Sequence, residues 1–359
     1  MRIKTIVLSS IMSLFLSGCM DIEPTVLNEI NIATAVSYDY IDKDHFTSTA
    51  VIPYYMPDKK VNNVTFTATA SLSKDVRQKM NQQTDKPIYS GKIEVILYSK
   101  ELAKHDLTRM TDTLIRDPSV GNTVYLAIVD GKAEDVLIKQ LGNVDKGTYL
   151  SNAIEHNIQS GILPKTNLHL FSYAQNAEGM DPFLPIIKPK NGNPLITGVA
   201  LFNQGVFVYQ TKEHENVIFK MLVEQSSNKE GFSAKLGEKL FASVYNISSK
   251  VSYNIPEPMT NSPIIINLNI EAVLREFTGD KVDKKEIRKI EKKMENVLKK
   301  RAEKLIVKLQ KLDVDPLGVG EQVRTRTRSW DKKEWKKLYP NIPFQVNVKL
   351  NILESGAVE

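Results

Sequence analysis

Two regular patterns dominate the last hundred residues of the chain. Apolar residues fill every second position from Ile264 to Leu274, which predicts a long strand with one buried face. A second alternation, from Phe344 to Ile352, predicts a closing strand. Between them, residues 280–312 carry apolar positions at steps of mostly three and four, the pattern of a helix with one apolar stripe. A coiled coil is the alternative, but we expect this long amphipathic helix to pack on a sheet, because the strands on either side of it need a cover.

The first half of the chain alternates between compact apolar strands and segments with a helical period. Residues 30–56 predict a hairpin, and residues 64–72 predict a further strand. GKIEVILYS, at 91–99, is apolar enough to be buried on both faces, and a helix is expected at 100–115. TVYLAIVDGKAEDVLIKQL, at 123–141, repeats the order of strand, turn and helix. This spacing favours parallel pairing inside a mixed sheet, so the predicted fold class is mixed α/β (α+β).

Two proline-rich stretches divide the chain. Four prolines fall between residues 182 and 194, and IPEPMTNSP occupies 255–263. Prolines at this density are typical of loops and linkers. We therefore predict three domains with mixed sheets and covering helices: an N-terminal domain at 19–188, a middle domain at 195–256 and a C-terminal domain at 262–359.

The first residues, MRIKTIVLSSIMSLFLSGCMDIEP, have the layout of a secretory signal peptide. A short basic head precedes an apolar run from Ile6 to Leu16, which is too short to span a bilayer. The run ends in Leu-Ser-Gly-Cys, which resembles the lipobox of bacterial lipoproteins. That resemblance implies that residues 1–18 are removed as a lipoprotein signal peptide and that Cys19, the one cysteine of the chain, is the lipid attachment site. The alternative is an unmodified cysteine within the signal peptide.

The lengths of the apolar stretches and the net charge indicate how the rest of the chain relates to a membrane. No other apolar stretch is long enough to span a bilayer, so we expect a body that is anchored to the membrane by lipid and does not cross it. The formal net charge is +6, and Arg2 and Lys4 of the signal peptide account for two of the 48 basic residues. A mature net charge of about +4 suits anionic headgroups but is no signature of nucleic-acid binding, so no nucleic-acid partner is predicted.

Little in the sequence points to catalysis. The five histidines are not spaced as a metal-ligand set, and the H-E-x-x-H and G-x-S-x-G patterns are absent. The stretch from Ser71 to Lys74 matches the S-x-x-K of penicillin-binding enzymes, but K-T-G and S-D-N are missing, so we interpret Ser73 as a helix cap. Gly318-Val319-Gly320 lacks the third glycine of a dinucleotide loop and is interpreted as a turn with positive φ after the long helix. We predict no catalytic residue, no cofactor and no metal.

A basic and aromatic cluster follows this turn. It consists of Arg324, Arg326, Arg328, Trp330, Lys332, Lys333, Trp335, Lys336 and Lys337. Such a cluster is able to contact headgroups or an acidic partner. A solvated helix face with tryptophans in the core is the favoured interpretation, because charge runs are usually solvated faces.

Taken in order, these segments resemble the Ger(x)C (GerAC-like) lipoproteins, the C subunits of spore germinant receptors. The lipobox is followed by an acidic residue in GCMD, and IATAVSYDYIDKD is similar to the family's alternating strand and aspartate-rich turn. Residues 91–137 resemble its run of strand, helix, Arg-Asp-Pro, strand and helix. DPLGVGEQVRTRTRSWDKKEWKKLYPNIPFQVNVKLNILESG resembles its Asp-Pro-x-Gly-x-Gly turn, Tyr-Pro tail and closing strand. Met20 stands where the family commonly has tryptophan, and glycines often found near Ser37 are missing.

The resemblance implies a fold of three mixed α/β domains and a role without catalysis. Members of the family are held by lipid on the outer face of the spore inner membrane. They assemble there with a polytopic A-type subunit and a polytopic, transporter-like B-type subunit into a receptor that senses nutrients and triggers germination. We expect the same partners, location and requirement for receptor assembly here, and the departures from the family pattern leave the germinant open.

Two other classes of protein share part of this layout. A solute-binding lipoprotein of an ABC transporter has a lipobox and a similar length, and it is the alternative function. Such a protein normally has two α/β lobes around a polar cleft, which the long charged helix between alternating strands does not suit. A lipid-anchored hydrolase would need a nucleophile with its base or a metal set, and the sequence shows neither.

Overall fold

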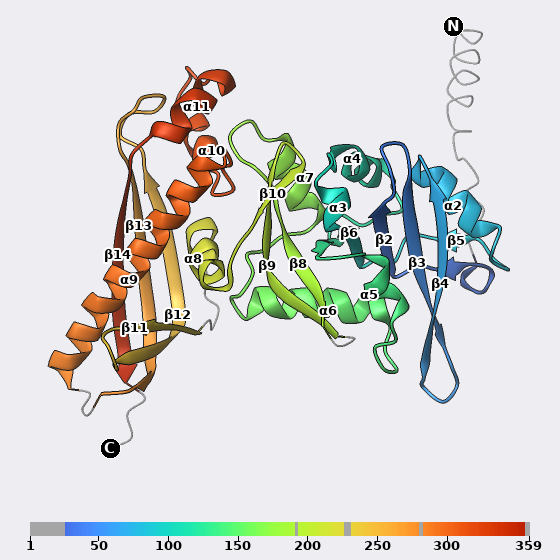
Figure 1. Ribbon diagram of the computed structural model, residues 1–359, viewed down its shortest axis with the longest axis horizontal. Helices are drawn as coiled ribbons and strands as arrows, with labels where there is room; N and C mark the ends of the chain where they lie inside the picture. The colour runs from blue at the N-terminus through green and yellow to red at the C-terminus, as the bar shows by residue number, and fades with distance from the viewer. Residues whose placement is uncertain (1–25, 191–192, 226–230, 280–282, 356–359) are drawn as a thin grey trace, which may run out of the picture.

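Two large sheets lie side by side along the long axis of the molecule (Figure 1). The computed structural model describes residues 26–190, 193–225, 231–279 and 283–355. The first sheet has eight strands in the order β10-β9-β8-β7-β6-β2-β3-β4. These strands are β2 (Ala35–Tyr40), β3 (Phe46–Tyr55), β4 (Val61–Ala70), β6 (Val95–Ser99), β7 (Tyr125–Val129), β8 (Phe183–Lys190), β9 (Asn193–Asn203) and β10 (Val206–Gln210).

The centre of the eight-stranded sheet is parallel and its edges are antiparallel. Strands β2, β6, β7 and β8 run parallel, as the strand-helix spacing predicts. Hairpins add β3 and β4 at one edge and β9 and β10 at the other. Every residue of β6 is buried, because helices cover both faces of the central strands.

Short helices share the two faces of this sheet. One face packs against α2 (Ser73–Asn81), α3 (Lys100–Ala103), α4 (Thr108–Arg116) and α7 (Leu168–Asn176). The other face packs against α5 (Glu134–Ile138), α6 (Lys146–Gln159) and α8 (Glu213–Val223). A two-stranded parallel pair of β1 (Asn31–Ile32) and β5 (Ile88–Tyr89) lies beside the sheet, after the 3-10 helix η1 (Leu27–Glu29).

The second sheet has one long helix as its cover. Its order is β11-β12-β13-β14, with β13 and β14 parallel and the other pairs antiparallel. The strands are β11 (Gly231–Lys235), β12 (Phe241–Asn254), β13 (Ile264–Phe277) and β14 (Phe344–Ser355). Helix α9 (Lys284–Lys311) packs across one face, and α10 (Val319–Arg324), α11 (Lys332–Leu338) and the 3-10 helix η2 (Tyr339–Asn341) lead from it to β14.

The long helix and the fold class are therefore confirmed. Helix α9 begins where Asp283 caps it, its Oδ1 accepting a hydrogen bond of 2.7 Å from the Glu286 backbone N–H. Buried residues of β13 alternate with partly or fully exposed ones, and Leu298 and Leu305 of α9 pack in the same apolar core. The chain is mixed α/β, with a long amphipathic helix packed on a sheet.

The strands of the predicted middle domain, 195–256, are divided between the two sheets. Strands β9 and β10 extend the first sheet, while β11 and β12 belong to the second. The first proline-rich stretch lies in the paired β8–β9 hairpin, where Pro185 is opposite Val199. The second joins β12 to its neighbour β13. Strands tolerate proline where no partner needs its N–H, so these prolines do not separate sheets. The limits of the three domains stay a prediction.

Helix α8 lies between the two sheets and joins their cores (Figure 1). It packs against β9 on one side and against β12 and α9 on the other. Lys308 of α9 forms an ion pair with Glu215 of α8 and donates a 2.7 Å hydrogen bond to the Tyr209 hydroxyl of β10. One apolar core therefore runs from the first sheet into the second. Among the helices described, none has the length and apolar character required to cross a bilayer.

Candidate functional site

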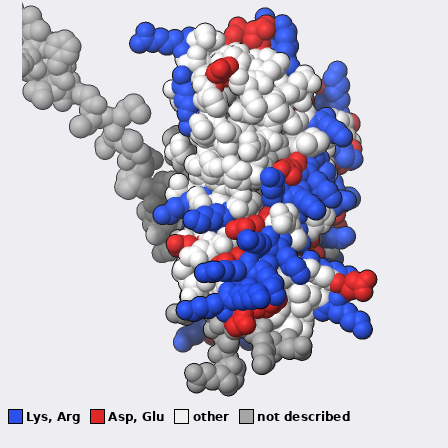
Figure 2. Space-filling view, turned by 90° about the vertical axis from the view of Figure 1, so that its left-hand side faces the viewer, with Lys and Arg blue, Asp and Glu red and all other residues white. Residues whose placement is uncertain are grey.

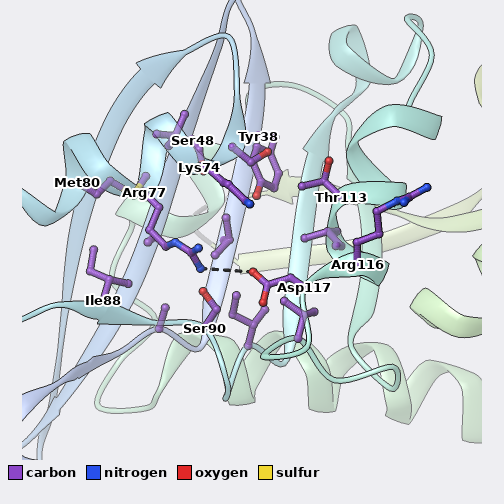
Figure 3. Close-up of a pocket in the computed structure, with 18 of the residues that line it drawn as sticks. Tyr38, Ser48, Lys74, Arg77, Met80, Ile88, Ser90, Thr113, Arg116 and Asp117 are labelled. Carbon is purple, nitrogen blue, oxygen red and sulfur yellow. Dashed lines mark hydrogen bonds and ion pairs between the residues drawn. The ribbon is translucent and has the colours of Figure 1, made fainter. Parts of the chain in front are cut away.

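A pocket of about 340 Å³ opens between α2 and α4 on one face of the eight-stranded sheet (Figure 3). Its floor includes Val36 of β2 and Ala50 of β3, which are register partners. The same register continues through Ile96 and Leu126 on the next two strands, where the side chains are larger. Protein interiors are normally close-packed, so the hollow follows from the small side chain of Ala50 and the gap between the two helices.

Charged groups from two elements face each other across the mouth of this pocket (Figure 3). Lys74 and Arg77 come from α2, and Asp117 follows the end of α4. Arg77 Nη1 lies 3.4 Å from Asp117 Oδ2. The other oxygen, Asp117 Oδ1, accepts hydrogen bonds of 3.0 Å and 2.6 Å from the backbone N–H and hydroxyl of Ser119. The carboxylate is thus held in place while the two cations line the opening.

The surroundings set the protonation of the pocket's polar groups. Burial opposes ionisation of Asp117, but the hydrogen bonds from Ser119 and the charge of Arg77 outweigh it, and the pKa of the carboxyl is lowered. Burial raises the pKa of the Tyr38 hydroxyl, with the hydrogen bond to Ser73 acting against it. Near neutral pH Asp117 is therefore a carboxylate and the Tyr38 hydroxyl is neutral.

The S-x-x-K stretch lies at this pocket, and its interpretation as a helix cap is wrong. Helix α2 begins at Ser73, Leu72 occupies the N-cap position, and no side chain caps the helix there. Ser73 and Lys74 instead line the pocket. Sequence reasoning missed Arg77 and Asp117, since 40 residues separate them and only the fold brings them together. The available signal was the i, i+3 spacing of Lys74 and Arg77, which places both cations on one side of a helix.

The turn DPLGVG, at 315–320, lies in the connection from α9 to β14 of the second sheet. Hydrogen bonds join it to the loop before β8 of the first sheet. Asp315 N–H donates a 2.8 Å hydrogen bond to Asp181 Oδ2, and Asp181 N–H donates one of 3.0 Å to the Asp315 carbonyl. The Asp315 carboxylate accepts hydrogen bonds of 3.0 Å and 2.7 Å from the N–H groups of Val319 and Gly320. Burial nevertheless raises the pKa of Asp315 to about 7, and burial also raises the pKa of Asp181. We call this contact between Asp181 and Asp315 the joint between the two sheets, and both of its carboxyl groups are shielded from solvent.

The glycines of this turn serve different purposes. Gly318, at φ +67°, is the N-cap residue of α10, and Asp313, at φ 52°, supplies the positive φ just after α9. The predicted turn with positive φ after the long helix is therefore confirmed at Gly318. Gly320 is needed for close approach, because a Cβ there would lie 2.7 Å from the Gly179 carbonyl and would also collide with Trp335 Nε1.

The basic and aromatic cluster divides between core and surface. Trp335 is buried, as the favoured interpretation predicts, and its ring packs near Tyr339. Trp330 is half-buried and donates a 2.6 Å hydrogen bond from Nε1 to Glu178 Oε2. Lys337 is solvated and pairs with Glu334. The tryptophans therefore hold the joint together.

A basic groove lies along the first half of α9. Figure 2 shows lysines and arginines gathered over the lower part of this end of the molecule. They line a groove beside β14 that includes Lys284, Lys285, Arg288, Lys289, Lys292 and Lys349. Two acids of the groove accept hydrogen bonds from the backbone of β14. Glu291 Oε1 accepts one of 2.8 Å from the Ile352 N–H, and Glu295 Oε1 accepts one of 2.9 Å from the Leu350 N–H. This surface attracts anions over a distance that salt limits to about 10 Å.

Two histidines, His45 and His105, make local contacts. His45 lies 2.9 Å from Asp42, and His105 stacks on Tyr40 with ring centroids 4.1 Å apart. Across the described residues, no group of three His, Cys, Asp or Glu side chains is placed to hold a metal ion.

Both parts of the chain match models of a known family. Residues 23–189 match the spore germination protein N-terminal domain, and residues 197–356 match the spore germination B3/GerAC-like C-terminal domain. The chain belongs to the GerAC-like family of spore germination proteins. The resemblance drawn from GCMD, Arg-Asp-Pro and DPLGVG is confirmed at the level of the family.

Individual relatives in this family cover most or all of the chain. Spore germination protein GerQC of Bacillus cereus is 29% identical over 99% of this chain and 100% of its own length. Spore germination protein KC of Bacillus subtilis (strain 168) is 22% identical over 78% of this chain and 75% of its own. The crystal structure of the GerBC protein matches with a TM-score of 0.59 at 17% identity, covering 89% of this chain and 96% of that one. That match confirms the fold.

The lipid attachment site predicted at Cys19 lies outside the described residues, as does the signal peptide predicted at 1–18. Both stay predictions. The GerAC-like match begins at residue 23, just after them.

Proposed function

We propose that this chain is the lipid-anchored, non-catalytic C subunit of a spore germinant receptor. The observation that carries the proposal is the match of both GerAC-like domains, which together extend from residue 23 to residue 356. The alignment with GerQC over the full length of both chains supports it. The two dissimilar sheets do not resemble the paired lobes of a solute-binding lipoprotein, so that alternative has no support in the fold.

The lipid on Cys19 fixes the height of the subunit above the membrane. Seven peptide steps join Cys19 to Val26, where the described chain begins, and they reach at most about 25 Å when extended. The first helical turn, η1, therefore stays close to the bilayer surface. Diacylglycerol supplies two acyl chains, and two chains are enough for stable anchoring.

Lipid anchoring confines this chain to the membrane that holds its partners, and this favours assembly. The partners are the A-type and B-type polytopic subunits of the receptor, whose exposed loops dock on the faces of this chain at the outer surface of the spore inner membrane. Confinement to the same membrane raises the effective concentration of the partners without any new contact. The joint at Asp315 and Asp181 keeps the two sheets in one orientation, so a partner can contact both at once.

Replacing Cys19 tests this proposal. Cys19→Ala removes the thiol that lipid attachment requires, and we expect the chain to leave the spore membrane fraction and nutrient-triggered germination to fall at least tenfold. Ser17→Ala is the matched control, because it keeps a small residue next to the predicted cleavage site and should behave as the parent. Unchanged membrane association and germination in Cys19→Ala spores would reject the anchored-subunit proposal.

A further inference from the structure

The pocket between α2 and α4 has cationic groups with unused hydrogen-bond donors. The Arg77 guanidinium carries five N–H donors, and its contact with Asp117 is long, at 3.4 Å. Lys74 is exposed, and within the described residues its Nζ has no hydrogen-bond or ion-pair partner. Both side chains extend from α2 toward the side of the pocket that carries Asp117 (Figure 3). They offer what a carboxylate needs, which is two or more charged donors from one side.

The single acid at the mouth orients Arg77 and leaves the rim positively charged. Asp117 Oδ1 is occupied by Ser119, and its low pKa keeps the group ionised. Arg116 is drawn turned away from the pocket in Figure 3 and pairs with Asp112 at 2.9 Å. Lys74 and Arg77 together carry two positive charges at the mouth, and Asp117 carries one negative charge. The N–H groups on the outer edge of the Arg77 guanidinium are left to bind a ligand.

The interior of the pocket is apolar. Its walls include Val36, Ala50, Met80, Leu114 and Val120, all of them part of the buried cluster on this face of the sheet. A volume of about 340 Å³ is at the small end of the range for ligand sites, which are mostly apolar with a few polar groups. An inorganic anion would leave this lining uncovered, whereas an apolar body would bury it.

We propose that this pocket binds a small organic carboxylate with an apolar body. The carboxylate lies between Arg77 and Lys74, and the apolar body lies against Ala50 and Met80. Asp117 is a positioning residue that holds the guanidinium toward the ligand. This proposal goes beyond the receptor role and does not depend on it, because it concerns binding by the chain alone.

The test uses saturation-transfer NMR and calorimetry on the full lipidated chain in detergent. The probes are pentanoate, 4-methylpentanoate and phenylacetate, each paired with its neutral amide and compared with inorganic phosphate. At least one carboxylate should bind, its amide should bind at least tenfold more weakly, and phosphate should compete poorly. Binding should also weaken as the salt concentration rises, because the mouth is open to solvent.

Three variants locate the binding. Arg77→Gln should weaken it by about ten- to a hundredfold, the usual effect of losing a hydrogen bond between charged groups. Lys74→Gln should weaken it severalfold, and because Lys74 is exposed this variant should fold normally. Ala50→Leu fills the pocket and should abolish binding. Lys79→Gln, on the same helix but outside the pocket lining, is the control for charge and should bind as the parent.

The outcomes show whether the ligand binds in the pocket or elsewhere. Weaker binding in Lys74→Gln and no binding in Ala50→Leu, with Lys79→Gln unchanged, support the site. Equal binding of carboxylates and amides, or binding that Arg77→Gln and Ala50→Leu leave intact, would attribute the signal to detergent or to another surface and overturn the proposal. The absence of binding by every carboxylate in the panel would overturn it as well.

Discussion

The two sheets of this chain are covered in different ways, and the difference determines where a pocket can form. Several short helices share each face of the eight-stranded sheet, and α2 and α4 leave a hollow between them. In the four-stranded sheet, the 28-residue helix α9 runs along the buried face with α8 beside it, and Met294 and Ala302 of α9 are completely buried. The gap between two short helices can bind a small molecule. The long helix instead stabilises its sheet and presents a charged outer surface.

The largest expected effect is the loss of packing under the long helix. Leu305→Ala removes a side chain that is 1% exposed between α9 and its sheet, and we expect the free energy of unfolding to fall by about 2–5 kcal/mol. Leu114→Ala, at the edge of the existing pocket, should cost less, because the pocket already reaches solvent there. Urea unfolding followed by circular dichroism measures both. Equal losses would mean that the two covers are packed alike.

The next effect concerns the joint between the sheets. Gly320→Ala forces a Cβ against the Gly179 carbonyl and Trp335, and overpacking of this kind costs about 1–3 kcal/mol. Gly237→Ala is the matched control, since a Cβ there would meet Leu240 Cβ at an ordinary 3.5 Å. We expect protease cleavage near residue 179 to accelerate in the first variant alone. The same stability in both variants would show that the joint tolerates a side chain at residue 320.

The buried acid of the joint should make stability depend on pH. Because burial raises the pKa of Asp315 to about 7, the folded chain keeps a proton that the unfolded chain loses near pH 4. This contribution is fully present below pH 4 and is lost as the pH rises toward 7, by up to about 1.4 kcal/mol per pH unit. Asp315→Asn cannot titrate, so its unfolding free energy should change less between pH 5 and pH 6 than that of the parent. Parallel pH profiles would contradict the assignment.

The smallest effect lies at the edge of the second sheet. Glu295→Ala removes the acceptor for the Leu350 N–H, and we expect a loss of roughly 0.5–1 kcal/mol, because solvent can replace much of the bond. Hydrogen exchange should accelerate at Leu350 but not at Ile352, which donates to Glu291. Uniform exchange along β14 would show that α9 protects this edge by coverage alone.

Patterns that repeat along the chain were predicted well, and features that depend on a distant contact were not. The alternation in β13 and β14 and the stripe of α9 identify one buried face each, so the long helix on its sheet followed directly. The prolines of 182–194 were taken for a linker because their tolerance in β8 depends on pairing with β9. The positive φ at Gly318 was predicted, but the need for glycine at residue 320 was missed, because the tryptophan that excludes a Cβ there is 15 positions away in the sequence.

The pocket could not be predicted for a similar reason. Ala50 reads as one more apolar residue of a strand, and only its register with Val36 and Ile96 shows that it is too small for its place. Arg77 and Asp117 carry no joint signal in the sequence. The family, in contrast, was evident from short motifs and from contiguous stretches of sequence, which need no distant contact to be recognised.

The measurement that tests the central claim most directly is a crosslinked capture of this chain from detergent-solubilised spore membranes, with partners identified by mass spectrometry. The receptor proposal predicts two polytopic membrane proteins recovered with this chain, one of them transporter-like, and their loss in the Cys19→Ala strain. Recovery of an ABC permease with its ATPase, or of no membrane protein at all, would contradict it.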